Sequence, residues 1–95
     1  MLVTSWDEPK RRKNIKDHGF DFAGCEAILD NFTITREDIR QAYGEKRLVT
    51  FGILEGTVAV LVYTERRAGP HIISLRKAEK HETRYYFEIA KEYFK

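Results

Sequence analysis

The sequence contains little of what marks several protein classes. Its 95 residues include one cysteine, Cys25, two prolines and one methionine. A single cysteine excludes an internal disulfide and is typical of proteins in a reducing compartment. No apolar run approaches the roughly 20 residues of a membrane-spanning helix, and the opening residues, MLVTSWDEP, lack the apolar core of a signal peptide. We therefore expect a soluble, cytoplasmic protein.

The composition describes a folded chain whose charge is unevenly placed. Aromatic residues make up 13% and charged residues 34% of the chain, and the length suits one domain, which we expect to span residues 1–95. The net charge of +2 excludes a polycation, so the position of each charge matters more than the total. Five basic residues crowd one short segment: Lys10, Arg11, Arg12, Lys13 and Lys16. Such a run usually forms a solvent-exposed face, but on an RNA-binding protein it can contact successive phosphates of the RNA backbone.

Hydrophobic periodicity and turn residues predict the elements. In the first half we expect a strand over residues 2–4, helices over 10–17 and 22–31, a strand over 32–35, and a loop with one helical turn over 36–43. In the second half we expect strands over 47–54, 57–64 and 71–76 and a helix over 77–94. These elements indicate an α+β fold, a small antiparallel sheet with two N-terminal helices and a long C-terminal helix, which we order as β-α-α-β-β-β-α.

Strand alternation brings several polar side chains together. Residues two apart share a face, so three pairs are expected to point together: Glu45 and Arg47, Thr64 and Arg66, and Ser74 and Arg76. In a hairpin the start of one strand lies beside the end of the next, which puts the first two pairs at the same end of the sheet. The third pair joins them only for some strand orders, which the sequence leaves open. On the first helix, Lys10, Asn14 and His18 share one stripe.

Four motifs occur in order along the chain. They are WDxxK…N…HGxxF over residues 6–22, GExR over 44–47, VYTxR over 62–66 and IISxRKA over 72–78. Together they resemble the BrnT toxins of bacterial type II toxin–antitoxin systems, over residues 6 to about 85. The resemblance implies a RelE-like ribonuclease fold and an RNA-cleaving toxin that inhibits translation and growth. It also implies a BrnA-type antitoxin as protein partner, through which alone DNA would be contacted.

Two positions depart from the family's pattern. Asp17 and His71 stand where the family usually has a basic residue. Either change would reduce the positive field that holds RNA without touching the chemistry.

In metal-free RNA cleavage a ribose 2′-OH attacks the neighbouring phosphate. This reaction requires a general base, a general acid, and cations that stabilise the charge developing on the phosphate. Arginine suits the phosphate because its planar fork binds two oxygens and keeps its charge. Glu45 is the expected base and His18 the expected acid, and the two roles are interchangeable at this stage. We expect catalysis from Glu45, Arg66, Arg76 and His18, and RNA binding from Lys10, Arg47, Ser74 and Lys77. No cofactor or metal is expected, because His71 and His81 have no companions at ligand spacing.

Each of these residues also has a structural interpretation. Arg66 and Arg76 can pair with Glu45, Glu65 or Glu79 as surface salt bridges. His18 can be favoured by the helix dipole, and Asn14 can hold the helix to the sheet rather than act in catalysis. The alternative function is a non-catalytic module on the same scaffold that binds RNA or an antitoxin. A small-molecule enzyme is disfavoured, because no cofactor motif is present.

Overall fold

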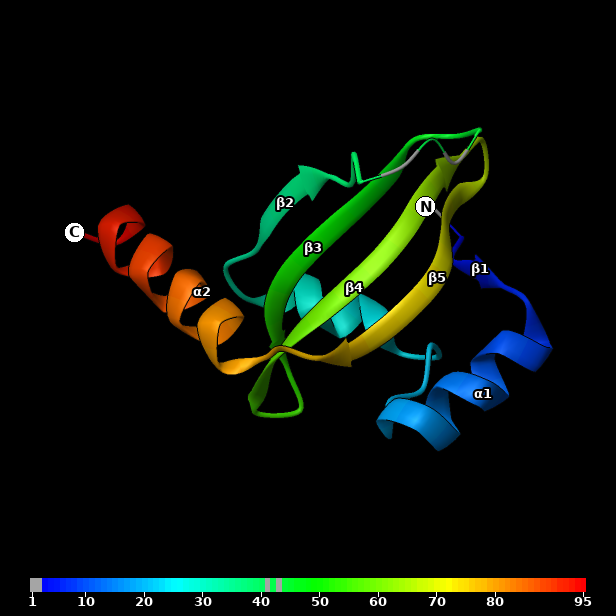
Figure 1. Cartoon of the computed structure of the whole chain (residues 1–95), viewed down its shortest axis with the longest axis horizontal. Coiled ribbons are helices and arrows are strands. Elements are labelled where there is room, and N and C mark those ends of the chain that lie inside the picture. The colour runs from blue at the N-terminus through cyan, green and yellow to red at the C-terminus, as the bar shows by residue number, and fades with distance from the viewer. Residues whose placement is uncertain (1–2, 41, 43) are drawn as a thin grey trace.

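A computed structural model describes residues 3–95 except residues 41 and 43 (Figure 1). Its elements are β1 (Ser5–Trp6), α1 (Glu8–His18), the 3-10 helix η1 (Cys25–Asp30), β2 (Ile34–Glu37), β3 (Arg47–Leu54), β4 (Thr57–Arg66), β5 (Gly69–Lys77) and α2 (Lys80–Tyr93). No helix in the described part of the chain is long and apolar enough to cross a membrane. The predicted α+β class is confirmed, since five strands form one sheet and helices pack on it.

The sheet has the strand order β1-β5-β4-β3-β2. Strands β2 to β5 pair antiparallel, whereas β1 pairs parallel to β5, so the prediction of an antiparallel sheet holds for four strands only. The predicted order β-α-α-β-β-β-α contains one strand too few. The strand predicted over residues 32–35 is present as β2, at Ile34–Glu37, in addition to β1, the β3–β4 hairpin and β5. The predicted strand at residues 2–4 lies instead at Ser5–Trp6; residue 2 is outside the described part.

The second predicted helix is also wrong in type and extent. Gly24 has φ 85° and precedes the short 3-10 helix η1, so residues 22–24 cannot continue a helix. The C-terminal helix begins at Lys80 rather than residue 77, because Lys77 still belongs to β5. Of the predicted loop over residues 36–43, residues 36–37 belong to β2 and residues 38–40 form no helical turn, while residues 41 and 43 are outside the described part.

The two faces of the sheet carry separate apolar clusters. Helices α1 and η1 cover one face, where the buried side chains include Phe22, Ile28, Leu61, Ile72 and Leu75. In Figure 1, η1 passes behind β3 and β4 while α1 lies beside β5. Helix α2 covers only part of the opposite face, over Phe51, Val58, Val60, Ala78 and Tyr86. The remainder of this second face is therefore open to ligands.

A β-bulge decides which side chains of β5 face which way. Val62 pairs with Ser74, but Tyr63 pairs with Ile72, so Ile73 is an extra residue in β5. The bulge puts Ile72 and Leu75 in the same buried core. Strict alternation had paired Ile73 with Leu75, and the bulge corrects that expectation. It also turns His71 to the face of Ser74.

Asn14 fastens α1 to the edge of β5, in agreement with its structural interpretation. Its side chain is buried, donates to the carbonyl oxygens of Phe20 at 2.9 Å and Leu75 at 2.7 Å, and accepts from the Leu75 N–H at 3.1 Å. Strand β1 pairs with β5 only at residues 71 and 72. The amide of Asn14 therefore satisfies backbone groups farther along an edge that β1 leaves uncovered.

Candidate functional site

Polar side chains gather where β4 ends and β3 begins. Arg47 pairs with Thr64 in the β3–β4 ladder, and Thr64 pairs with His71 in the β4–β5 ladder. The expectation that the Glu45/Arg47 and Thr64/Arg66 pairs lie at one end of the sheet is confirmed. We call Lys10, Glu45, Arg66 and His71 the strand-exit cluster.

The acidic and basic members of the strand-exit cluster form a loose, open pair. The Arg66 Nη2 lies 3.8 Å from the Glu45 Oε1, and the two side chains are 52% and 45% exposed. A long pair in water contributes little to stability and leaves both groups free to contact a ligand. Arg66 therefore belongs to the surface rather than to the framework of the fold.

His71 is the titratable group at the centre of this cluster. Its Nδ1 lies 2.9 Å from the Ser5 hydroxyl of β1. Partial burial, and next the positive charge of Arg66, lower the pKa of His71 below its usual range; Lys10 acts in the same direction and Glu45 opposes it. His71 was not among the predicted site residues, and strict alternation in β5 would put it on the face opposite Ser74 and Arg76. Only the bulge reveals its position.

Helix α1 brings Lys10 to the cluster and takes His18 away from it. Lys10 is near enough to His71 to lower its pKa, and Asn14, one turn later, contacts Leu75. The helix therefore runs along β5, and His18 lies eight residues beyond Lys10, about 12 Å along the axis. The structure does not bring the predicted acid His18 together with Glu45 and Arg66.

Much of the basic run on α1 is occupied by ion pairs. Arg11 binds Asp21 through its Nε at 2.7 Å and its Nη2 at 2.9 Å, and also pairs with Glu8. Lys13 pairs with Asp17 at 2.6 Å, so the acidic residue that departs from the family's pattern neutralises a lysine of the same helix. The run is thus partly a framework feature and partly, at Lys10, a feature of the site.

Arg76 occupies a different environment from Arg66. Its Nη1 and Nη2 donate to the two carboxylate oxygens of Glu82 at 2.8 and 2.9 Å, and Glu82 also accepts the backbone N–H of Glu79 at 2.9 Å. These hydrogen bonds, that of Arg76 first, lower the pKa of Glu82 to about 2. Glu82 was not among the partners expected from the sequence. Arg76 closes the junction between β5 and α2.

The two arginines are too far apart to hold one phosphate. Arg76 pairs with Val60 in the β4–β5 ladder, and Val60 is six residues before Arg66 on β4. At the rise of a β-strand this separation is about 20 Å. Of the predicted catalytic residues, the structure groups Glu45 with Arg66 and places Arg76 and His18 elsewhere.

A groove of about 420 Å³ runs over the open part of the second sheet face. Its polar lining comprises Arg36, Glu37, Asp38, Arg40, Ser74, Arg76 and Glu82, and Val49, Phe51, Val60 and Val62 are apolar residues that line it. Arg36 stacks over the rings of Phe51 and Tyr85, with its guanidinium carbon 5.1 and 5.6 Å from the centroids. We call this feature the central groove. Sequence reasoning found Ser74 and Arg76 but missed Arg36, which it assigned to a loop. Lys77 is exposed at the end of β5.

The central groove and the strand-exit cluster belong to one sheet face. Cross-strand rows lead from Arg47, Thr64 and His71 to Val49, Val62 and Ser74, and then to Phe51, Val60 and Arg76. A negatively charged chain laid along these rows would meet cations at both ends and at Arg36.

Comparison with known proteins identifies a family whose model matches this chain. A family model described as ribonuclease toxin, BrnT, of type II toxin–antitoxin system matches residues 6–82. A comparison with curated proteins finds no match. The family match begins at Trp6, the last residue of β1, covers α1, η1 and β2 to β5, and ends in the first turn of α2; it includes all residues of the strand-exit cluster.

Proposed function

Because the chain belongs to the BrnT family of ribonuclease toxins from type II toxin–antitoxin systems, we propose that it is a metal-independent endoribonuclease. The observation that carries this proposal is the strand-exit cluster, in which a carboxylate, an imidazole and two cations meet at an exposed end of the sheet. These are the groups that cleavage by a ribose 2′-OH requires.

In this mechanism Glu45 is the general base. Its carboxylate takes the proton of the 2′-OH as the 2′-oxygen attacks the adjacent phosphorus. The bond from phosphorus to the 5′-oxygen breaks, which leaves a 2′,3′-cyclic phosphate and a 5′-hydroxyl. Arg66 and Lys10 stabilise the negative charge that builds on the phosphate.

His71 protonates the leaving 5′-oxygen and replaces His18 as the proposed acid. Burial and the charge of Arg66 disfavour its imidazolium in the free protein. A phosphate bound at Arg66 offsets that charge and favours the protonated ring, so substrate binding itself prepares the acid. The exchanged assignment, with neutral His71 as the general base, predicts the opposite pH dependence of the cleavage rate.

The RNA on one side of the scissile phosphate lies in the central groove. Arg36 and Ser74 line this groove, and Arg47 lies one cross-strand row beyond it on the same face. Lys77 pairs with Ala59, which belongs to the cluster on the opposite face, so the predicted role of Lys77 in RNA binding is not part of this proposal. We assign Arg36, Ser74 and Arg47 to RNA binding. Arg76 shapes the groove and fixes α2 rather than contacting the reacting phosphate, since both of its terminal nitrogens are held by Glu82.

A BrnA-type antitoxin is the proposed protein partner, and the cytoplasm the proposed compartment. An antitoxin that covers the strand-exit cluster and the central groove would block substrate directly, which is the simplest form of neutralisation. The mixed sheet with helices on both faces also suits the RelE-like fold that the family resemblance implies, and we retain that fold assignment as part of the proposal.

The test uses purified protein, labelled single-stranded RNA and EDTA, with analysis of the product ends. We expect products that end in 2′,3′-cyclic phosphate and that disappear in Arg66→Ala. Products ending in 3′-hydroxyl, or cleavage abolished by EDTA, would overturn the mechanism. The protein could instead bind RNA in a salt-sensitive way and leave it intact, both alone and with ribosomes. That result would favour the non-catalytic binding module.

A further inference from the structure

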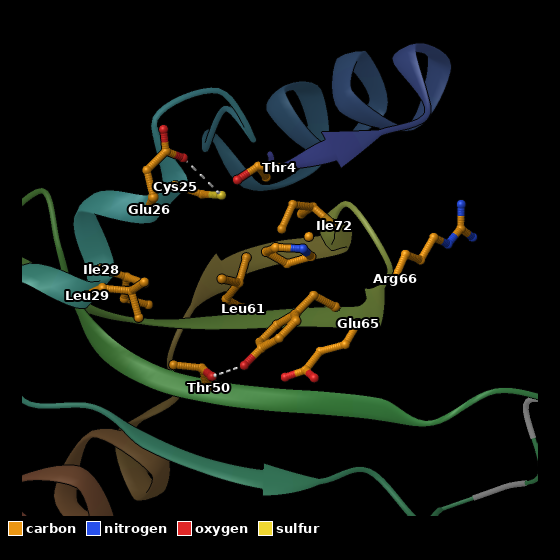
Figure 2. Close-up of a pocket in the computed structure, with 13 residues that line it drawn as sticks. Thr4, Cys25, Glu26, Ile28, Leu29, Thr50, Leu61, Glu65, Arg66 and Ile72 are labelled. Atoms are coloured by element: carbon orange, nitrogen blue, oxygen red, sulfur yellow. Dashed lines mark hydrogen bonds between the residues drawn. The ribbon is translucent and has the colours of Figure 1, made fainter. Parts of the chain in front are cut away.

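A second cavity lies on the face of the sheet that α1 and η1 cover, behind the strand-exit cluster. Its volume is about 320 Å³, within the usual range for small-ligand pockets. Figure 2 shows η1 with Cys25, Ile28 and Leu29 on one side and Leu61 and Ile72 of the sheet on the other. Burial raises the pKa of Cys25 to about 12, so this thiol is an inert part of the wall. The proposed mechanism does not use this space.

The cavity reaches the proposed active site at the end of β4. Glu65 and Arg66 are consecutive residues, and both line the cavity. In Figure 2 the Glu65 side chain points along the strands toward Thr50, whereas Arg66 extends away from the cavity. A nucleotide whose phosphate contacts Arg66 can therefore place its base beside Glu65. Phosphate and base would lie on either side of the last residues of β4.

The lining offers an aromatic ring and a hydroxyl donor. Tyr63 is two residues before Glu65, on the same strand face, and also lines the cavity. Its phenolic oxygen accepts a hydrogen bond from the Thr50 hydroxyl at 3.2 Å, and Thr50 is in turn 2.7 Å from the Thr35 hydroxyl. Within the described part of the chain the Tyr63 hydroxyl has no acceptor, so its hydrogen is left to donate to a ligand.

Glu65 supplies two acceptors in the same cavity. Its side chain is exposed and makes no hydrogen bond or ion pair with any residue that the structure describes. An ionised carboxylate accepts only, and it accepts best from two adjacent donors. Glu65 and Tyr63, two residues apart on β4, thus present two acceptors and one donor to a ligand at this end of the cavity.

From this pattern, and resting on the proposed function, we infer that the cavity binds a guanine base adjacent to the scissile phosphate. The Watson–Crick edge of guanine carries two neighbouring donors, N1–H and N2–H₂, followed by the O6 acceptor. Glu65 would accept from N1 and N2, and Tyr63 would donate to O6. Adenine, cytosine and uracil each present only one donor on this edge, so none of them can satisfy both carboxylate oxygens. The apolar wall and the Tyr63 ring suit an unstacked base.

The test measures binding of guanosine 3′-monophosphate and of the three other 3′-mononucleotides by calorimetry. We expect the guanine nucleotide to bind at least tenfold more tightly than the others. Glu65→Gln should remove most of this preference, because the amide donates where guanine also donates. Tyr63→Phe should weaken guanine binding severalfold. Glu88→Gln, which removes the same charge from the exposed surface of α2, is the matched control and should bind like the parent.

Cleavage mapping separates this inference from the proposed function. If the protein cuts RNA in EDTA with no guanine at a fixed position beside its cuts, and Glu65→Gln changes neither cuts nor binding, the inference is wrong and the function stands. If RNA stays intact while guanine binding depends on Glu65, the guanine site stands as a binding site and the catalytic proposal fails. Equal affinity for all four nucleotides overturns the inference in either case.

Discussion

Arg66 and Arg76 lie on neighbouring strands of one sheet, yet their ion pairs differ in length and in exposure to solvent. Arg66 is 3.8 Å from the exposed carboxylate of Glu45. Arg76 makes two short hydrogen bonds to Glu82, whose side chain is only 14% exposed. From this comparison we infer that the geometry of its partner decides whether an arginine in a family motif binds a ligand or stabilises the fold. The following predictions test that division between the strand-exit end and the α2 end of the sheet.

The largest effect is expected at His71. His71→Gln should lower the cleavage rate by roughly 10²- to 10⁴-fold, because it removes the proposed acid. The melting temperature should change little, since the side-chain hydrogen bond between His71 and Ser5 is exposed. Rates on labelled RNA and thermal melts measure both. His81→Gln, on the exposed surface of α2, is the matched control. If His18→Gln lost a comparable part of the cleavage rate while His71→Gln stayed active, His18 would be the general acid, as the sequence analysis suggested.

The pH dependence tests the same assignment. If His71 acts as an acid, kcat/KM falls as the pH rises through the pKa of His71, and this limb lies below about pH 6.5 because burial and Arg66 lower that pKa. If neutral His71 is the base, kcat/KM rises over the same interval. A profile measured from pH 4 to 8, with His71→Gln in parallel, shows which limb belongs to this residue.

Arg66 comes next in expected size. Arg66→Ala should reduce cleavage by roughly 10²- to 10³-fold, the usual cost of removing one group that stabilises charge in a transition state. Stability should remain within about 0.5 kcal/mol of the parent, because the pair with Glu45 is long and exposed. Arg67→Ala removes the adjacent exposed arginine as a control. If both variants lost activity equally, general attraction of RNA to positive charge would explain the effect and the specific role of Arg66 would be lost.

Arg76 should give the opposite result. Arg76→Ala leaves Glu82 without its bidentate partner, and we expect the free energy of unfolding to fall by about 1–3 kcal/mol. Urea unfolding at neutral pH measures this change. The cleavage rate per folded molecule should fall by less than tenfold. A loss as large as that of Arg66→Ala, in a protein of unchanged stability, would return Arg76 to the catalytic site.

The sequence predicted the parts of this arrangement that depend on local pattern. The turn at Glu55 and Gly56 and the runs on either side of it determine the β3–β4 register, and that register brings Glu45 and Arg66 together. Helix α1 was expected close to its observed bounds because Gly19 ends it with φ 76°. These features need no knowledge of distant contacts.

The remaining features depend on details of strand pairing and chain direction that the pattern of residue types does not encode. The bulge at Ile73 turns His71 to the site face, and it lies in the β4–β5 ladder, where Val62 pairs with Ser74 but Tyr63 pairs with Ile72. Strict alternation cannot reveal an extra residue. The partner of Arg76 was missed for a related reason. Glu82 is six residues away and comes within reach only because the chain turns from β5 into α2.

The smallest predicted effect concerns acid stability at the α2 end. The folded-state pKa of Glu82 is lowered from 4.5 to about 2, chiefly by its hydrogen bonds with Arg76. A lowered pKa contributes stability that is fully present above pH 4.5 and is lost as the pH falls toward 2.

Glu82→Gln keeps an acceptor for the Glu79 N–H, as a capping box allows, but removes the charge. We expect this variant to be less stable than the parent by about 1 kcal/mol at pH 7 and nearly equal to it at pH 2. Glu88→Gln, an exposed glutamate of the same helix, should follow the parent at both values in urea unfolding. A constant difference between the parent and Glu82→Gln across this range would mean that shape rather than charge joins Arg76 to Glu82, and the contrast with the loose Arg66 pair would then rest on packing alone.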